Sequence, residues 1–396
     1  MIEITKKENC SGCSSCANIC PKNCITMQMD NESFLYPEVN KADCINCNLC
    51  EGSCPIINPI IEEKHEQKAF LIQNKDEQIR RESTSGGAFT AIAKYVLSQG
   101  GVVFGACFDE NYVVKHTYVE TEEDLKKFRN SKYVQSQIGD TFSTAKNFLV
   151  NNRMVCFSGT PCQIEGLKCY IGKEYDNLIT VDVVCHAVTA PLLWEKYLNM
   201  KKLAIGTNIN KVIFRDKYFG YKYSTITICS DEKEYHSGVE SDQWLRAFFS
   251  EICDRPSCHK CKFKKIYRVS DFTIWDCFTV DVFNKGMDDD RGTTRVITQS
   301  EKGEKILDLI KDEIIYCSID VDKAIDGVKE MFYSVAPNPK REQFITDMQK
   351  MDGEELLNKY FPETFKVKAE RFARHMSYRL GIYKQMKKIV KTIVKK

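Results

Sequence analysis

The run C-S-G-C-S-S-C-A-N-I-C-P, from Cys10 to Pro21, and the run C-I-N-C-N-L-C-E-G-S-C-P, from Cys44 to Pro55, share one spacing. In each run three cysteines stand at three-residue intervals, and a fourth cysteine follows and precedes a proline. This is the spacing of bacterial two-cluster ferredoxins, in which the fourth cysteine of each run ligates the other 4Fe–4S cluster. The two runs therefore predict a ferredoxin-type domain with two clusters over residues 1–60.

The same spacing assigns the ligands of each cluster. The first cluster is predicted on Cys10, Cys13, Cys16 and Cys54, and the second on Cys20, Cys44, Cys47 and Cys50. The alternatives are a disulfide framework or paired zinc sites. Neither predicts a triple C-x-x-C-x-x-C run closed by C-P, because a structural zinc site takes four ligands, usually as two separated pairs.

Length and composition place this domain in a larger protein. A chain of 396 residues exceeds one small core and predicts two or three domains. Its twenty cysteines are not preceded by an apolar leader, so we expect a reducing, anaerobic cytoplasm rather than secretion. No run approaches the roughly eighteen apolar residues of a membrane span.

The net charge is only +2, but its distribution is uneven. From Lys366 onward eleven basic residues face Glu370 alone, so the body is acidic and the tail is basic. Apolar residues recur at helical spacing within the tail: Phe372, Met376, Leu380, Tyr383, Met386, Val390 and Ile393. This pattern predicts a basic amphipathic helix. We expect the helix to contact either the anionic inner face of a membrane or an acidic partner. The alternative is that it packs on the protein's own acidic body. No groove-reading motif accompanies the charge, so nucleic acid is not an expected partner.

After a polar linker near residues 61–68, buried strand-like runs alternate with helical runs. Strands are predicted at 69–73, 102–106, 154–157 and 178–184. The alternation predicts an α/β domain, α+β overall with the ferredoxin unit, in which neighbouring strands run parallel. We place the two parts of this domain at 66–150 and 151–330, and C-terminal helices at 331–396.

Two groups of residues at predicted loop positions carry further chemistry. The loop S-T-S-G-G, Ser83 to Gly87, feeds a helix and offers backbone N–H groups to a phosphate, with a plain N-cap as the alternative. Cys162 and Cys185 each follow a buried strand, at the edge where open α/β sheets bind ligands. With the C-x-x-C pair they predict a third 4Fe–4S cluster on Cys162, Cys185, Cys258 and Cys261.

The third cluster has alternatives. The C-x-x-C pair is also typical of a redox pair, and buried cysteines also serve as small hydrophobic residues. A zinc site is the other alternative, completed by His259, Cys253 or Cys277. Cys24 is expected as a small core residue.

Other polar residues receive less specific predictions. His186 beside Cys185 is either a hydrogen-bond donor to a cofactor or an ordinary loop histidine. The remaining polar-flanked histidines are predicted at the surface: His65, His116, His236 and His375. Three consecutive acids, Asp288 to Asp290, predict a solvated turn, with a divalent-cation site as the alternative.

Motifs along most of the chain resemble those of the coenzyme F-420 hydrogenase/dehydrogenase beta-subunit family, with a ferredoxin domain fused in front. The matching segments are S-T-S-G-G at 83–87, S-K-Y-V-Q-S at 131–136, S-G-T-P-C-Q-I-E-G-L-K at 158–168, D-V-V-C-H-A at 182–187, C-H-K-C-K-F at 258–263 and P-K-R-E-Q-F at 339–344. Their order and spacing agree with the family from Cys10 to about Phe344.

The resemblance implies a flavin enzyme with FAD bound near the S-T-S-G-G loop and the S-K-Y-V-Q-S segment, which contains Lys132. The implied FAD-binding residues are Ser83, Thr84, Ser85, Gly86, Gly87, Lys132, Tyr133, Gln135, Ser136 and Thr160. It also implies the further 4Fe–4S cluster. In well-known members a hydride passes between the flavin and a deazaflavin, while the clusters exchange single electrons with a partner. No catalytic residue is assigned.

The sequence departs from the family pattern at a few positions. Ala187, Ser270 and Trp275 stand where glycines are common, and the bulky Trp275 argues against a deazaflavin-shaped pocket. We therefore expect an iron–sulfur flavoprotein oxidoreductase that exchanges electrons with a ferredoxin or another redox partner. Its hydride acceptor is coenzyme F-420, or a small molecule or sugar-linked substrate of polysaccharide biosynthesis. The rivals are a non-catalytic electron-relay subunit and a zinc-stabilised binding module.

Overall fold

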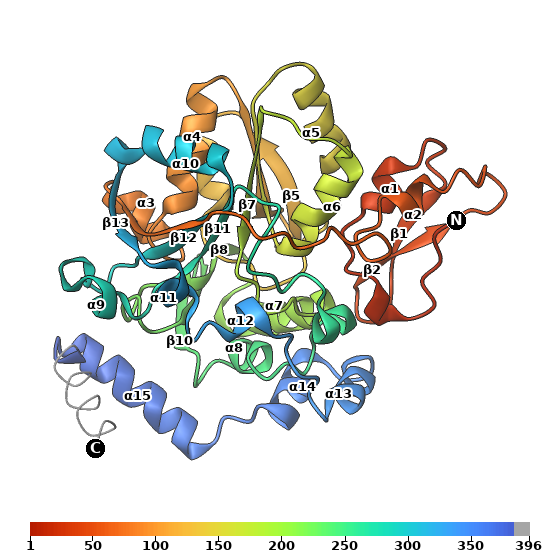
Figure 1. Ribbon diagram of the computed structural model, residues 1–396. Coiled ribbons are helices and arrows are strands. Elements are labelled where there is room, and N and C mark those ends of the chain that lie inside the picture. The colour runs from red at the N-terminus through yellow and green to blue at the C-terminus, as the bar shows by residue number, and fades with distance from the viewer. Residues whose placement is uncertain (384–396) are drawn as a thin grey trace.

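The computed structural model describes residues 1–383. In this part of the chain, an eight-stranded mixed sheet lies at the centre, in the order β13-β3-β12-β11-β7-β6-β4-β5 (Figure 1). Its strands are β3 (Lys68–Asn74), β4 (Val102–Phe108), β5 (Val114–Val119), β6 (Val155–Gly159), β7 (Leu178–Val183), β11 (Phe272–Asp276), β12 (Thr294–Thr298) and β13 (Ile314–Ile319). The mixed α/β fold class is thus the predicted one.

The four central strands run parallel: β4 pairs with β6, β6 with β7, and β7 with β11. Both faces of this part of the sheet are covered by helices, as parallel sheets require. Val103 and Cys156 point to the face covered by α4 (Ala88–Ser98) and α10 (Glu301–Leu309). Phe104 and Phe157 point to the opposite face, under α5 (Thr141–Val150) and α6 (Pro161–Ile171).

A smaller three-stranded antiparallel sheet, in the order β10-β9-β8, lies beside the main sheet. Its strands are β8 (Ile209–Asp216), β9 (Thr225–Ser230) and β10 (Glu234–Gly238). It shares a core with four helices, α7 (Pro191–Ile205), α8 (Gln243–Phe248), α13 (Arg341–Met348) and α14 (Gly353–Tyr360). At the centre of this core, Trp194 and Trp244 pack edge to face with ring centroids 5.1 Å apart.

Short helices complete the body of the protein. They are α3 (Glu77–Glu82), η2 (Glu123–Phe128), η3 (Pro256–Lys260), α9 (Val280–Phe283), η4 (Lys285–Met287), η5 (Lys311–Glu313), α11 (Val321–Ile325) and α12 (Lys329–Phe332). Several connect a strand of the main sheet to the next element, and η3 carries one cysteine of the C-x-x-C pair.

The N-terminal unit projects from one side of the molecule and packs against α6 (Figure 1). It contains η1 (Lys7–Asn9), α1 (Ser15–Ile19), β1 (Ile25–Met29), β2 (Leu35–Val39) and α2 (Leu49–Gly52), with β1 and β2 paired antiparallel. Cysteines make up much of its small core. A unit of this size therefore depends on the body, or on what its cysteines bind, for much of its stability.

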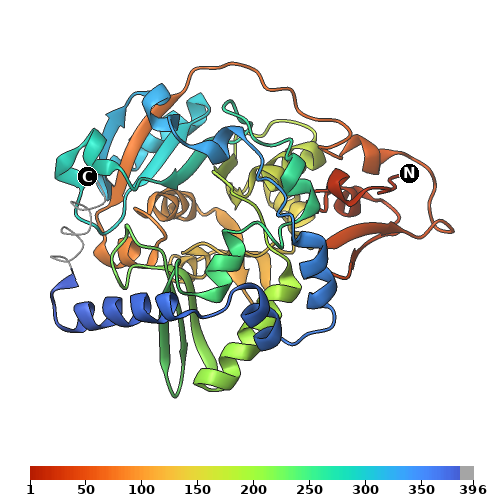
Figure 2. The same cartoon turned by 90° about the horizontal axis from the view of Figure 1, so that it is seen from below.

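The last described helix, α15 (Phe365–Arg379), lies along the edge of the molecule away from the N-terminal unit (Figure 2). One side of it is fastened to the body: Arg374 stacks over the Tyr223 ring at 3.5 Å, and Tyr378 packs against Tyr218 at 4.7 Å. The rest of the predicted amphipathic stripe, Met386, Val390 and Ile393, lies outside the described residues. Within residues 1–383 no helix combines the length and apolar character needed to cross a bilayer.

We predict that Gly166→Ala separates the N-terminal unit from the body. A Cβ at Gly166 on α6 would lie 2.8 Å from Cβ and 3.0 Å from Sγ of Cys13. This clash is expected to cost about 1–3 kcal/mol and to lower the midpoint of thermal unfolding. Helix propensity acts in the opposite direction, because alanine normally stabilises a helix over glycine by about 1 kcal/mol. A lower midpoint can therefore be attributed to the clash.

Gly52→Ala in α2 is the matched control, because nothing lies within 4 Å of its Cβ position. We expect it to leave the midpoint unchanged or raised. Equal midpoints for the two variants would show that the contact between α6 and Cys13 does not carry the interface.

Candidate functional site

The predicted ligands of the first cluster gather on the side of the N-terminal unit that faces the body. Cys10, Cys13, Cys16 and Cys54 are each 9% exposed or less. Burial raises the pKa of the Cys13 thiol to about 12, and the nearby charges of Cys10 and Cys54 raise it too. The same two charges, with that of Cys13, act on Cys16, so the four sulfurs are close neighbours. This thiolate set fits a 4Fe–4S cluster, as the predicted crossed pairing of the two runs requires.

The second predicted set lies at the outer end of the same unit. Cys20, Cys44, Cys47 and Cys50 line one small cavity, and Cys47 is exposed. Cys24 lines it as well, with its Sγ 3.4 Å from that of Cys20. Cys24 is buried, as expected of a core residue, but it also lies beside the predicted ligands.

A third set of cysteines comes together from three separate parts of the body. The charges of Cys185 and Cys261 act on both Cys162 and Cys258. Cys162 stands in the first turn of α6, where Thr160 lies 3.1 Å from its Sγ, and it also interacts electrostatically with Cys13. The third set is thus adjacent to the first. All twenty cysteines of the chain are free thiols, so none of the three sets is tied up in disulfide bonds.

Within residues 1–383 no group of three or more His, Cys, Asp or Glu side chains converges on one ion position. Ligands of a 4Fe–4S cluster bind separate iron atoms, so their sulfurs stand further apart than around one zinc.

Arg255 joins the first and third sets. Its side chain is fully buried, and its guanidinium donates to the Cys10 and Leu35 carbonyls at 2.9 Å and to Gln135 Oε1 at 2.6 Å. Its Nη2 also lies 3.6 Å from the Cys10 sulfur. Since the Cys258 backbone N–H donates to the Arg255 carbonyl, one residue contacts both cysteine sets.

A cavity of about 720 Å³ opens at the carboxyl ends of the parallel strands, next to the third set. Cys185 lines it. Eight of the ten predicted FAD-binding residues line it too: Ser83, Thr84, Ser85, Gly87, Lys132, Tyr133, Ser136 and Thr160. Gly86 and Gln135 do not; Gly86 packs beneath the Ile72 carbonyl, and Gln135 bonds to Ser11 and Arg255.

The cavity wall fits a polar, anionic cofactor such as FAD. Among the described residues, Arg129 Nε, Arg215 Nη2 and Trp275 Nε1 are buried donors without a hydrogen-bond partner, and all three residues line the cavity. No side chain caps α4, which begins after Gly87. Burial lowers the pKa of Lys132 to about 8, and its Nζ donates to the Lys127 and Arg129 carbonyls at 3.0 and 2.9 Å. Unsatisfied donors of this kind normally have a ligand or water.

One prediction about an individual residue fails here. His116 was expected at the surface but is 6% exposed, stacked on Phe157 at 5.5 Å, and burial lowers its pKa to about 4. Its position on β5, with polar neighbours in sequence, concealed this, because alternate residues of a strand face opposite sides. His186 lines the cavity and lies 3.3 Å from Glu251.

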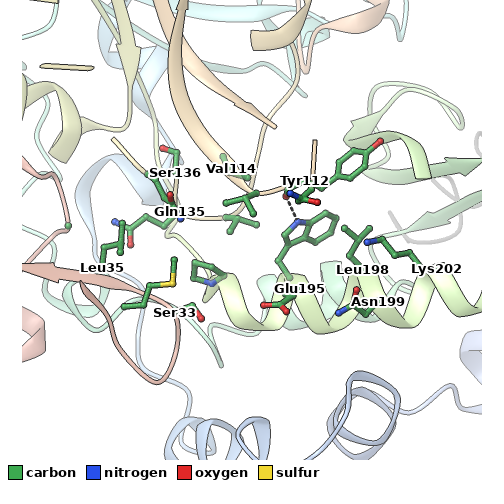
Figure 3. Close-up of a pocket in the computed structure, with 18 residues that line it drawn as sticks. Ser33, Leu35, Tyr112, Val114, Gln135, Ser136, Glu195, Leu198, Asn199 and Lys202 are labelled. Atoms are coloured by element: carbon green, nitrogen blue, oxygen red, sulfur yellow. Dashed lines mark hydrogen bonds between the residues drawn. The ribbon is translucent and has the colours of Figure 1, made fainter. Parts of the chain in front are cut away.

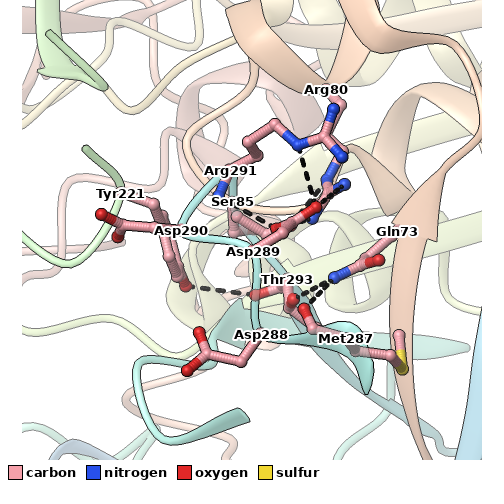
Figure 4. Close-up of polar contacts among 12 residues, drawn as sticks. Gln73, Arg80, Ser85, Tyr221, Met287, Asp288, Asp289, Asp290, Arg291 and Thr293 are labelled. Atoms are coloured by element: carbon pink, nitrogen blue, oxygen red, sulfur yellow. Dashed lines mark hydrogen bonds and ion pairs between the residues drawn. The ribbon is translucent and has the colours of Figure 1, made fainter. Parts of the chain in front are cut away.

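The acidic turn is engaged by basic side chains. Arg80 forms a two-pronged ion pair with Asp289, both contacts at 2.7 Å (Figure 4). Lys222 pairs with Asp288 at 2.7 Å. Arg80 also donates to the Gly292 carbonyl at 2.9 Å. The turn therefore fastens α3 and the loop after it, while Asp288 and Asp289 stay exposed, as expected of a solvated turn.

A second cavity, of about 340 Å³, lies between the β1–β2 hairpin and α7 (Figure 3). Val134 and Ser136 line both this cavity and the larger one. Its wall is largely apolar, with Leu35, Val114 and Leu198 among its side chains. It borders the first cysteine set through Gly12.

Three family models match the chain. Residues 69–142 match the model for the N-terminal part of the beta subunit of coenzyme F420 hydrogenase/dehydrogenase, and residues 152–323 match the model for the C terminus of the same beta subunit. Residues 9–56 match the 4Fe-4S dicluster domain.

Individual relatives are more distant. The coenzyme F420-dependent sulfite reductase of Methanocaldococcus jannaschii is 25% identical over 332 residues, which cover 78% of this chain and 47% of that protein. The chain thus spans about half the length of this relative. An uncharacterized ferredoxin of the same organism is 36% identical over 52 residues, covering 13% of this chain and 66% of the ferredoxin. A chain in a structure of the F420-reducing NiFe hydrogenase complex from Methanosarcina barkeri aligns at 15% identity with a TM-score of 0.44, covering 78% of this chain and 97% of that one.

The dicluster domain and the adjoining α/β body define an iron–sulfur oxidoreductase. The chain belongs to the coenzyme F420 hydrogenase/dehydrogenase beta-subunit family, with its ferredoxin-type domain at the N-terminal end.

We predict that Arg255→Gln lowers the reduction potential of the inner cluster of the N-terminal unit. Its positive charge and its N–H group near the Cys10 sulfur favour the reduced cluster, which carries one more negative charge. Potentiometric titration followed by EPR measures the midpoint.

Lys260→Gln is the control, since it also removes one positive charge, but from a side chain that is 68% exposed and, among the described acids, pairs only with Glu8 near Cys10. Solvent screens such a charge. Equal shifts in the two variants would contradict a role for burial and for the contact with Cys10.

Proposed function

We propose that this protein is an FAD-dependent oxidoreductase that exchanges electrons with a ferredoxin-type partner and a hydride with a small molecule. The observation that carries the proposal is the contiguity of four sites. The exposed Cys47 end, the inner Cys13 set, the Cys162 set and the large cavity follow one another, each in contact or electrostatic interaction with the next.

Each segment of the chain has a defined task in this arrangement. Bound FAD supplies the conversion between two-electron hydride chemistry and single-electron transfer. The loop Ser83–Gly87 and the uncapped start of α4 present backbone donors to its phosphates, and Lys132 supplies positive charge at the cavity wall. Cys185 places the third thiol set at the wall of the same cavity. Arg255 fixes the N-terminal unit against the body.

For the hydride acceptor we propose the deazaflavin coenzyme F420, on the strength of family membership and the name of the sulfite reductase relative. A second candidate is a sugar-linked or other small-molecule acceptor of polysaccharide biosynthesis. Trp275 favours this second candidate, because its bulky indole lines the cavity and leaves less room for a three-ring acceptor than a smaller side chain would.

Anaerobic reconstitution with iron, sulfide and FAD tests the proposal. We expect iron and sulfide equivalent to three 4Fe–4S clusters, one bound FAD, and bleaching of the flavin by dithionite-reduced ferredoxin. Reoxidation by F420, measured against a panel of nucleotide sugars, selects between the two acceptors. Clusters without bound flavin would select an electron-relay subunit, and zinc without iron would select a binding module.

A Lys132→Ala variant tests the FAD site itself. We expect roughly ten-fold weaker FAD binding, because a charged donor to phosphate is lost. Because the pKa of Lys132 lies at about 8, wild-type affinity falls as the pH rises through that value, and the variant lacks this dependence. Lys115→Ala, on the exposed side of β5, is the control, and the same FAD affinity in all three proteins would remove Lys132 from the site.

We further propose that α15 rests on an anionic membrane surface. Phe365, Phe372 and Leu380 are 87%, 67% and 64% exposed, and basic residues of the helix stand between them. An apolar strip flanked by lysine and arginine matches anionic headgroups in charge and the acyl boundary in polarity. The opposite side of α15 packs on the body, so the protein would dock as a whole.

Phe372→Ser tests this membrane contact. We expect several-fold weaker sedimentation of the full chain with phosphatidylserine-containing vesicles, because an exposed phenyl group no longer enters the lipid. The control is Leu203→Ser on α7, which removes an apolar side chain that is 86% exposed elsewhere. Equal binding of the two variants, or equal binding to neutral vesicles, would contradict the proposal.

A further inference from the structure

Arg215 is a buried cation that lines the large cavity and has an unused donor. It stands on β8 and is 7% exposed. Its Nη1 donates to the Tyr133 hydroxyl at 3.0 Å and to Asp276 at 3.1 Å, while its Nη2 is buried and has no partner among the described residues. The guanidinium also lies over the Phe278 ring at 5.2 Å.

The backbone of Arg215 is locked in place. Its N–H donates to Asn130 Oδ1 at 3.0 Å, and the Asn130 amide donates back to the Arg215 carbonyl at 3.0 Å. Tyr133, which holds Nη1, is itself stacked on Phe248 with ring centroids 4.3 Å apart. The Arg215 guanidinium is therefore held in one orientation. Its buried, unpartnered N–H group costs folding free energy unless a ligand accepts a hydrogen bond from it.

The other unsatisfied nitrogens of the wall limit the chemistry of that ligand. Arg129 Nε and Trp275 Nε1 are also buried, unpartnered and part of the cavity lining. Guanidinium and indole nitrogens donate and never accept. A ligand that satisfies all three must therefore carry several acceptor oxygens. Burial acts to lower the pKa of Arg215, but Asp276 and Tyr133 raise it by more, so the group stays charged.

We propose that Arg215 binds an anionic oxygen group, phosphate or carboxylate, on the hydride-exchanging substrate. This rests on the proposed function, in which the phosphates of FAD occupy the Ser83–Gly87 loop. That loop has its own donors, whereas Arg215 comes from the smaller sheet and is held by Tyr133 and Asp276. The cavity thus has a second anion site in addition to the one that the cofactor needs.

The test uses the FAD-loaded protein and inorganic phosphate as the probe. Phosphate is expected to perturb the visible spectrum of the bound flavin in a saturable way, and sodium chloride at equal ionic strength is not. In Arg215→Gln the affinity for phosphate is expected to fall roughly ten-fold or more, with the FAD content unchanged. Arg153→Gln, which breaks a surface ion pair with Glu120, is the matched control.

A double variant, Arg215→Gln with Asp276→Asn, guards against misfolding, because it removes the buried pair without leaving Asp276 uncompensated. It is expected to behave as the single variant does. Loss of FAD from either variant would assign Arg215 to the cofactor and overturn the proposal, as would an unchanged response to phosphate. If the wild-type protein binds no flavin, the proposed function fails, and the shift in unfolding midpoint with phosphate still tests Arg215.

Discussion

The arrangement of the molecule depends on the buried charge of Arg255. A guanidinium without solvent is tolerated only where its N–H groups are satisfied, and Arg255 meets this condition through groups of both domains. The Cys10 and Leu35 carbonyls come from the N-terminal unit, and Gln135 comes from the body. Gly12 is required at the same place: its φ is +72°, and a Cβ there would lie 2.8 Å from Arg255 Nη1. Neither domain satisfies this cation alone, so the two are held in one relative position.

That position determines which cysteines become neighbours. The N-terminal unit is seated with α1 against α6, the helix whose first turn carries Cys162. Glycine at 166 allows the approach, because any side chain there would contact Cys13. The inner thiol set consequently lies beside the third set, and the outer set with Cys47 faces solvent. Within residues 1–383, the Cys47 end of the series is thus open to a protein partner, and the Cys185 end opens on the large cavity.

Local patterns predicted what depends on local sequence. The cysteine spacing gave the two sets of the ferredoxin unit, and buried apolar runs gave β6 and β7 to within a residue or two. The sheet β8–β10 was missed, because Ile209–Asp216 mixes lysine, asparagine and arginine with its apolar residues. Arg215 and Arg255 carry no spacing signal at all. A single arginine becomes a buried anchor only through tertiary contacts with residues 61 to 245 positions away, which no sequence window contains.

At the Ser83–Gly87 loop the cavity wall remains rich in donors, because the acids of the neighbouring turn pair with basic side chains. Asp289 is paired with Arg80 and Asp288 with Lys222, and neither residue lines the large cavity. Lys217 donates to the Ser85 carbonyl at 2.6 Å, which ties up an acceptor of the loop. An anion approaching that wall therefore meets N–H groups and cations with few competing oxygens. Had Asp288 and Asp289 lined the cavity at this loop, their repulsion would have opposed a phosphate there, whatever the number of donors.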